Sequence, residues 1–173
     1  IYIYSEYLFS YQSLHHNLNN QNTVSAGYDH NLILHADGTV TALGRNSSGQ
    51  STVPDNLSDV VAVSAGREHS MALRSDGTVV TWGGESSNEY GDAQMPDNLS
   101  NVIAISANRT HSMALRSDST VVAWGGENTY GQHTVPDGLS DVIAISAGAY
   151  HSLVLHSDGT VTVSDDGRGI PID

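Results

Sequence analysis

One sequence unit of roughly 40 residues recurs four times along the chain, and this repetition constrains the fold more than any other feature. The copies align on a histidine that follows a Ser-Ala-Gly or Ser-Ala-Asn triplet. The four aligned histidines are His30, His69, His111 and His151. Successive histidines lie 39, 42 and 40 residues apart. A period of this length is typical of propeller and solenoid arrays, in which each unit is one supersecondary motif.

Each unit carries the pattern of short β-strands. In residues 69–74 and 78–82 bulky and small side chains alternate with a period of two, which indicates two strands. An Asp-Gly pair joins them and predicts a hairpin turn. Residues 60–63 predict a third strand, and the run before Pro96 is a candidate fourth strand at the edge. Neither face of the hairpin is polar, so we expect an all-β fold of blades covered on both sides by neighbours.

The aligned histidines are candidates for chemistry, but their strand neighbours favour a structural role. His69 shares its strand face with Met71 and Leu73, and His151 shares its face with similar residues. We therefore interpret the histidines as buried imidazoles that bond to backbone between blades. The aspartate of each Asp-Gly turn is interpreted as a turn former, because its carboxylate can bond to the backbone two residues on.

Several motifs resemble the repeat of the regulator of chromosome condensation family. Residues 63–73 and 145–155 match it best, and the Trp-Gly, Gly-Gln and Val-Pro pairs of the units strengthen the match. The resemblance covers about residues 23–166. It implies a β-propeller of about four such blades. Because family members have seven blades, it implies either a partial propeller or a ring completed by oligomerisation. The short repeats are most like those of bacterial members, which include a secreted inhibitor of β-lactamase.

Composition excludes several kinds of site. The chain has six arginines, no lysine and 19 acidic residues, and its net charge is −13. This balance repels a nucleic-acid backbone, so we expect no nucleic-acid partner. The absence of cysteine excludes disulfides, thiol catalysis and zinc-thiolate sites, and leaves the compartment open. No hydrophobic run is long enough to cross a membrane. We expect no cofactor, no metal and no enzymatic activity.

The two ends of the chain depart from the repeat. Residues 1–22 form a separate non-repeat segment, whose pattern fits a strand or a helix, and we expect it to act as a cap or an interface. The blades are expected in residues 23–173. Residues 155–173 also resemble the Asp-x-Gly-x-Gly segment of the gyrase B subunit, in which Asp165 would bond to adenine. The helix and the lid of that family are missing, so a turn that ends the array is the favoured interpretation.

The variable positions of the repeat predict the functional surface. They lie just before each aligned histidine and just after each Trp-Gly, at opposite ends of nearby strands or on adjoining rims. Tyrosine and arginine are enriched at binding hot spots. The candidate partner-binding residues are Tyr28, Arg67, Glu68, Tyr90, Arg109, Tyr130 and Tyr150. We expect a non-enzymatic module that binds another protein, with an inhibitor of an extracellular enzyme as its sharper form. The alternatives are a self-assembling half-propeller joined through its open blade edges and an ATP-binding fragment like gyrase B.

Overall fold

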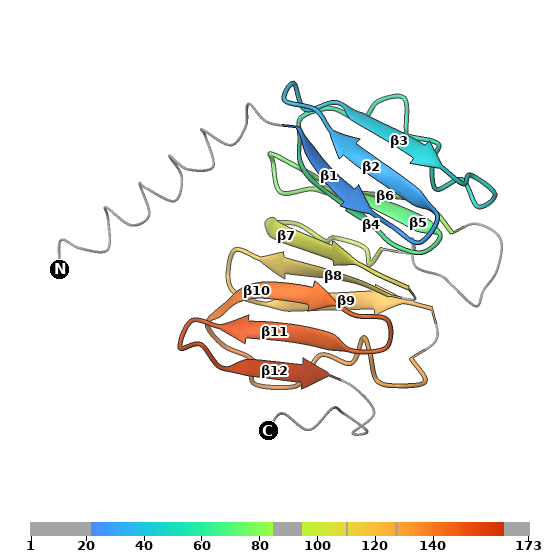
Figure 1. Cartoon of the computed structure of the whole chain (residues 1–173). Helices are drawn as coiled ribbons and strands as arrows, with labels where there is room; N and C mark the ends of the chain where they lie inside the picture. Colours follow the sequence, from blue (N-terminus) through green and yellow to red (C-terminus); the bar gives the residue numbers. More distant parts are fainter. Residues whose placement is uncertain (1–21, 85–94, 110, 127, 165–173) are drawn as a thin grey trace, which may run out of the picture.

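Each of the four repeats folds into one three-stranded antiparallel sheet, or blade (Figure 1). The computed structural model describes residues 22–84, 95–109, 111–126 and 128–164. These residues contain no helix. Blade 1 consists of β1 (Thr23–Ala26), β2 (His30–Leu34) and β3 (Val40–Gly44), and blade 2 of β4 (Val60–Ala65), β5 (His69–Arg74) and β6 (Val79–Gly83). Blade 3 consists of β7 (Val102–Ala107), β8 (His111–Arg116) and β9 (Val121–Gly125), and blade 4 of β10 (Val142–Ala147), β11 (Ser152–His156) and β12 (Val161–Ser164). The all-β prediction is confirmed.

The hairpin between the second and third strands forms where the Asp-Gly pairs predict it. In blade 2, Asp76 Oδ1 accepts hydrogen bonds from the backbone N–H of Thr78 at 2.9 Å and from its hydroxyl at 2.6 Å. Gly77 adopts a φ of 80°, a left-handed conformation that glycine takes without strain. The turn aspartates are therefore turn formers, as the sequence predicts.

The blades follow one another in a fan (Figure 1). The first strands of successive blades contact one another, so β1, β4, β7 and β10 form the inner edge of the fan. The middle strand of each blade packs on the first strand of the next. This is the radial packing of a propeller, in which each sheet covers its neighbour.

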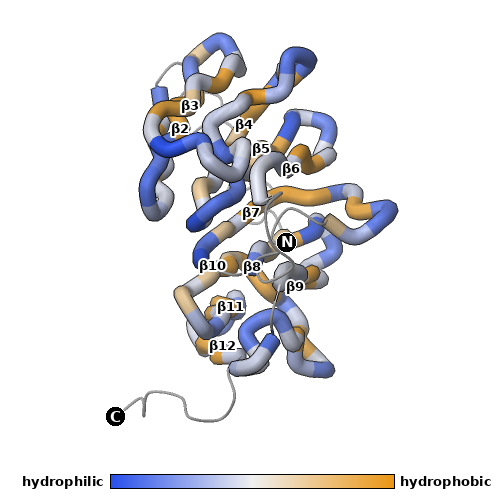
Figure 2. Tube along the Cα trace, turned by 90° about the vertical axis from the view of Figure 1, so that its right-hand side faces the viewer, coloured by the Kyte–Doolittle hydropathy of each residue, from blue (hydrophilic) through white to orange (hydrophobic). Residues whose placement is uncertain are grey.

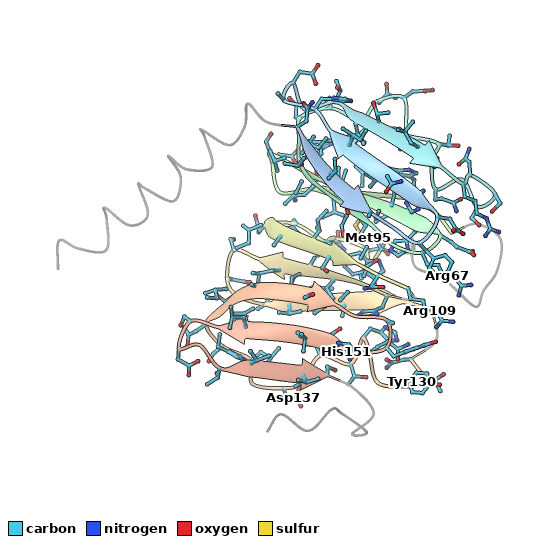
Figure 3. The ribbon with its side chains drawn as sticks, in the orientation of Figure 1. Arg67, Met95, Arg109, Tyr130, Asp137 and His151 are labelled. Atoms are coloured by element: carbon cyan, nitrogen blue, oxygen red, sulfur yellow. The ribbon has the colours of Figure 1, made fainter. Side chains whose placement is uncertain are left out.

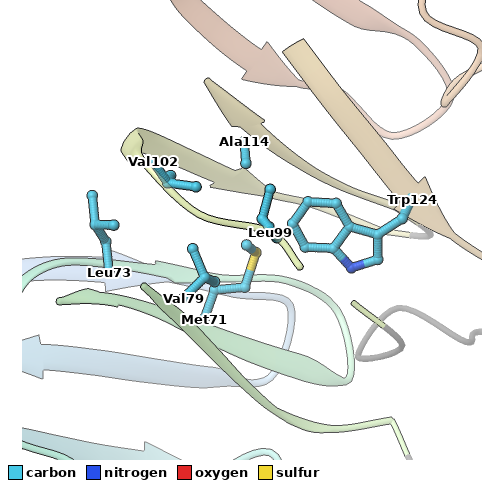
Figure 4. Close-up of a cluster of buried hydrophobic side chains, with 7 residues drawn as sticks. All are labelled: Met71, Leu73, Val79, Leu99, Val102, Ala114 and Trp124. Atoms are coloured by element: carbon cyan, nitrogen blue, oxygen red, sulfur yellow. The ribbon is translucent and has the colours of Figure 1, made fainter. Parts of the chain in front are cut away.

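The hydrophobic core lies between the blades and not within any one of them. Met71 and Leu73 of blade 2 pack against Ala114 and Trp124 of blade 3 (Figure 4). The same exchange of large and small residues joins blades 1 and 2, where Leu32 meets Ala72 and Trp82 of the next blade. Hydrophobic residues follow the strands, and the connections between them are mostly hydrophilic (Figure 2). Each blade therefore depends on a neighbour to bury its apolar faces.

The candidate edge strand before Pro96 falls outside the described residues, apart from Met95. In blades 1 and 3 the corresponding residues 51–54 and 133–136 are described, and they form no fourth strand. Their Val-Pro pairs offer no N–H at the proline and do not extend the sheet. In blade 4, Ser164 takes the place of the tryptophan and donates hydrogen bonds to the carbonyls of Gly131 and Thr134. The N-terminal segment lies outside the described residues, apart from Asn22.

Candidate functional site

The aligned histidines join consecutive blades. Three of them, His30, His69 and His111, are fully buried, and the Nε2 of each faces the hydroxyl of a serine on the next blade. The fourth, His151, is half-buried, because no described blade follows blade 4 to cover it. The three pairs are His30–Ser70 at 2.9 Å, His69–Ser112 at 2.9 Å and His111–Ser152 at 2.8 Å. For these three histidines the predicted role between blades is confirmed. The partner of Nε2 is a serine side chain, which the sequence interpretation did not name. This serine directly follows the aligned histidine of the next repeat, and its hydroxyl faces back toward the preceding blade.

The serine fixes which imidazole nitrogen carries the proton. Ser70 donates its own proton to the carbonyl of Gln50, and Ser152 donates its proton to that of Gln132. The histidine must therefore donate from Nε2, which places the lone pair on Nδ1. Nδ1 of His30 and of His111 is buried and has no hydrogen-bond partner among the described residues.

Burial favours the neutral form of His30 and His111, because it lowers the pKa of both side chains. It is the largest cause that lowers the pKa of His30. Burial, reinforced by the neighbouring imidazoles of His133, His69 and His151, lowers the pKa of His111 to about 4. A neutral, buried and hydrogen-bonded imidazole is suited to structure and not to acid-base catalysis at a surface.

The first residues of the triplet also join the blades. Ser25, Ser64 and Ser106 each accept a hydrogen bond from the backbone N–H of the next blade's triplet alanine, at 2.9–3.0 Å. Two backbone bonds extend this contact, from Tyr28 N–H to Gly66 and from Arg67 N–H to Asn108. In the third repeat Asn108 replaces glycine and donates from Nδ2 to the carbonyl of Ala147 on blade 4, at 2.8 Å. The constant residues of the repeat therefore form the hydrogen bonds that join consecutive blades.

The Trp-Gly glycine brings the two variable segments of a blade together. A Cβ at Gly83 would lie 2.6 Å from the carbonyl oxygen of Glu68 and 2.9 Å from the Cα of Gln50, so only glycine fits there. The next residue, Gly84, donates a backbone hydrogen bond to the carbonyl of Glu68. In blade 1, the backbone N–H of Arg45 donates to the carbonyl of Asp29 in the same way. The segment after the third strand thus lies beside the loop between the first and second strands, and both variable sets share one rim. This settles the two placements that the sequence leaves open.

We call this end of the fan the loop rim. It consists of the loops between first and second strands, residues 27–29, 66–68, 108–109 and 148–150, and of residues 45–51 and 128–134 after the third strands. The opposite end, which carries the hairpins at residues 35–39, 74–78, 116–120 and 156–160, is the turn rim.

Aromatic and guanidinium side chains contact one another on the loop rim. Arg67 lies over the ring of Tyr28 at 5.4 Å, and Arg109 lies over the ring of Tyr150 at 4.8 Å. Arg109 also donates a hydrogen bond to the Tyr150 hydroxyl. The rings of Tyr130 and Tyr150 meet edge to face with their centroids 5.0 Å apart. Figure 3 shows Arg67, Arg109 and Tyr130 at the same end of the blades.

Of the remaining predicted site residues, Glu68 lies on the same rim and Tyr90 lies outside the described residues. Glu68 accepts a hydrogen bond from the hydroxyl of Ser48 at 3.3 Å. The structure therefore brings six of the seven predicted residues to one rim.

The segment after the third strand is built in the same way in blades 1 and 3. Gln50 and Gln132 are buried, and their side-chain carbonyls accept the backbone N–H of Ser48 and Tyr130. The asparagines that precede them, Asn46 and Asn128, close the segment with bonds to Thr52 and Thr134. This shared frame holds Tyr130 in place in one blade and Ser48 in the other.

A pocket of about 440 Å³ opens on the loop rim where the inner strands end. Small residues line most of it, and the larger side chains at its edge are Tyr28, Arg67, Asn108 and Arg109. We call it the mouth pocket. Sequence reasoning did not select Asn108, although its departure from the Ser-Ala-Gly triplet is the signal that marks it.

The turn rim differs in charge. It carries the four turn aspartates, Asp37, Asp76, Asp118 and Asp158, all of them exposed. The threonine hydroxyl of each turn is the main cause that lowers the pKa of its aspartate. These carboxylates are ionised at neutral pH, so four of the 19 acidic residues lie at the end of the blades away from the mouth pocket.

The described residues bear on three further kinds of site. They contain no group of three or more histidine, aspartate or glutamate side chains arranged to hold a metal ion. They also contain no helix with the length and apolar character of a membrane span. Of the segment that resembles gyrase B, the part up to Ser164 belongs to blade 4, and Asp165, Gly167 and Gly169 lie outside the described residues.

The repeats match a known family. The family model of the Regulator of chromosome condensation (RCC1) repeat matches residues 22–50, 60–92, 102–132 and 142–164, which together make up more than half of the chain. No curated protein sequence matches the chain.

Solved structures with the same fold are β-propellers related to this family. Human WBSCR16 is 24% identical with a TM-score of 0.68, and the match covers 83% of this chain and 46% of that one. Yeast RCC1 (Prp20), solved bound to Kap60, is 20% identical with a TM-score of 0.68, over 83% of this chain and 43% of that one. The ectodomain of the Arabidopsis thaliana receptor kinase ACR4 is 21% identical with a TM-score of 0.69, over 89% and 53%. The chain spans about half the length of these structures.

Proposed function

The chain belongs to the regulator of chromosome condensation repeat family, and on that premise we propose that it is a non-enzymatic module that binds a partner protein through its loop rim. One observation carries the proposal. The constant residues of the repeat are occupied in bonds between blades, whereas the variable residues gather on one rim as contacting arginines and tyrosines. Such side chains dominate the binding energy of many protein interfaces.

The chemistry of the chain supports binding over catalysis. Three of its aligned histidines are buried and bonded to serines, and its turn aspartates are engaged with threonines. The net charge of −13 disfavours a nucleic-acid partner. A protein partner also accords with the yeast relative, which was solved in a complex with Kap60. An inhibitor of an extracellular enzyme is the sharper form of the proposal, and it rests on the resemblance to bacterial members alone.

The test begins with a partner captured by the intact protein, identified by mass spectrometry and purified. Its affinity is then measured by calorimetry for the wild type and for the double variant Tyr130→Ala/Tyr150→Ala. We expect a loss of at least about tenfold, because two exposed hot-spot rings are removed. The matched control is Val61→Ala, which shortens an exposed side chain on an inner strand away from the rim. Equal losses in the double variant and the control would reject the loop rim as the binding surface.

Self-association is a second candidate, supported by the two blade faces that lack a neighbour among the described residues. Val161 and Val163 on β12 are 47% and 38% exposed, and Leu43 on β3 is 53% exposed. The residues of blade 2 aligned with Val161 and Leu43 are Val79 and Trp82, and both pack against an adjacent blade. Light scattering over a range of concentrations tests this. Association should weaken in Val161→Asp and persist in Val61→Asp, whose valine is 46% exposed. A monomer at all concentrations would reject self-association and leave the binding module standing.

A further inference from the structure

We propose that the mouth pocket binds an acidic segment of the partner protein, with aspartate or glutamate side chains paired to Arg67 and Arg109. The inference rests on the proposed function and specifies which chemistry the loop rim recognises. It is carried by the placement of two arginines at the edge of one pocket in a chain that is otherwise strongly acidic.

The arginines are set side by side by the bonds between blades. The backbone N–H of Arg67 donates to the carbonyl of Asn108 at 3.1 Å. Arg109 directly follows Asn108, so this hydrogen bond brings the two arginines close together along the chain of contacts between blades. Each guanidinium lies over a tyrosine ring, Arg67 over Tyr28 and Arg109 over Tyr150. The N–H donors of a guanidinium lie in one plane, where a carboxylate can bind to two of them.

The residue that directly follows the Ser-Ala-Gly or Ser-Ala-Asn triplet varies from blade to blade, and we call its place the mouth position. It is occupied by Tyr28, Arg67, Arg109 and Ala149 in the four blades. All four residues line the pocket. The positions around them serve the contacts between blades, so this position is where a ligand preference can be encoded without disturbing the packing.

The rest of the lining suits a polypeptide. Most of it consists of alanine and glycine, including Ala26, Ala65, Ala107, Gly27 and Gly66. Such a surface lets a peptide backbone approach closely, and a volume of about 440 Å³ admits a few side chains. The lining therefore combines small residues, which leave the backbone accessible, with the cationic side chains of Arg67 and Arg109.

The turn aspartates lie far from the mouth pocket. A strand of five or six residues is roughly 17–20 Å long, so the turn aspartates lie about two Debye lengths from the mouth pocket at physiological ionic strength. On the loop rim itself, Asp29 is paired with Arg45 at 3.2 Å, and Glu68 accepts the hydroxyl of Ser48. Both acidic residues described in the strand loops of the loop rim are therefore engaged with neighbouring side chains. A long polyanion would also meet the acidic remainder of the chain, which favours an acidic protein segment over nucleic acid.

The test is a titration of the isotope-labelled protein, followed by NMR, with the blocked peptide acetyl-Gly-Glu-Asp-Glu-Gly-amide and its uncharged counterpart acetyl-Gly-Gln-Asn-Gln-Gly-amide. We expect saturable shifts of the amides at residues 27–28, 66–67 and 108–109 with the acidic peptide only. Arg67→Gln/Arg109→Gln should weaken binding at least about tenfold, because charge-assisted hydrogen bonds are lost.

A matched control is available on the same two blades. Arg74→Gln/Arg116→Gln removes the same charge at the turn rim, and it should weaken binding less than about twofold, because those charges are screened from the pocket. Equal losses in the two double variants would overturn the proposal, and so would equal binding of the two peptides.

A third peptide, acetyl-Gly-Gly-Gly-Ala with a free carboxyl end, separates the two sources of a carboxylate. Binding of this peptide in place of the acidic one would overturn the assignment to acidic side chains. A partner that depends on Tyr130 and Tyr150, together with no binding of the acidic peptide, would reject this inference and leave the proposed function intact.

Discussion

His111 Nε2 lies 2.8 Å from Ser152 Oγ, so a buried side chain of blade 3 is bonded directly to a buried side chain of blade 4. The same relationship joins blades 1 and 2 and blades 2 and 3. Because the apolar core also lies between blades, the blades should unfold together and not one at a time.

Replacing Ser152 with alanine should lower the free energy of unfolding, although only one hydroxyl is removed. Ser152→Ala leaves the Nε2–H of His111 buried without its acceptor, which costs about 1–3 kcal/mol. Urea unfolding, followed by circular dichroism, measures the free energy of unfolding. The control is Asn31→Ala, because Asn31 is exposed and occupies the aligned position in blade 1, where no described blade precedes it. The control should stay within about 0.5 kcal/mol of the wild type, and an equal loss in both variants would contradict the role of the bond.

Stability should fall as the pH is lowered from about 6.5 to about 4. The unfolded histidine takes up its proton near pH 6.5, whereas burial lowers the pKa of His111 in the folded protein to about 4. The stability that the neutral imidazole contributes is therefore complete above pH 6.5 and is lost through this window, by about 3 kcal/mol. The lowered pKa of His30 acts in the same direction.

The turn aspartates do not obscure this window. Their pKa values are lowered from 3.8, so the stability they contribute is lost only at more acidic pH. The measurement is the free energy of unfolding in urea at pH 7 and at pH 4.5, for the wild type and for His111→Gln. The variant should show a smaller decrease. An unchanged wild-type stability between the two pH values would be inconsistent with a neutral buried imidazole.

The Trp-Gly glycine should be far less replaceable than a turn glycine with the same backbone conformation. Gly83 and Gly159 have φ values of 87° and 88°, so alanine meets the same backbone strain at both. That strain costs about 1 kcal/mol. Only at Gly83 would the added Cβ also meet backbone atoms, the closest at 2.6 Å, whereas Gly159 has nothing within 4 Å. We expect Gly83→Ala to lower the melting temperature clearly more than Gly159→Ala, and equal shifts would refute the close approach.

Much of the fold follows from the sequence because the repeat encodes it locally. The period of the aligned histidines, the alternation around Met71 and the Asp76-Gly77 turn together predict the blades and their hairpins. The contact of His69 with Ser112 does not follow in the same way. It depends on how one sheet is set against the next, and no local pattern records that registration.

The candidate site was predictable in composition but not in arrangement. Tyr28, Arg67 and Arg109 stand out because they vary within a constant motif. The antiparallel order of the strands places the segments of Tyr130 and Tyr150 at the same rim. It does not predict that the two rings touch, because they come from different blades. The mouth pocket was not predicted, because it arises from the curvature with which the inner strands follow one another.

The most direct test of the proposed function is hydrogen exchange, read by mass spectrometry, on the protein alone and in complex with its purified partner. The account predicts slower exchange in the partner complex at residues 27–29, 66–68, 108–109 and 148–150, with the turns at residues 35–39, 74–78 and 116–120 unchanged. Protection of the turns, with the loop rim exchanging as in the isolated protein, would contradict it.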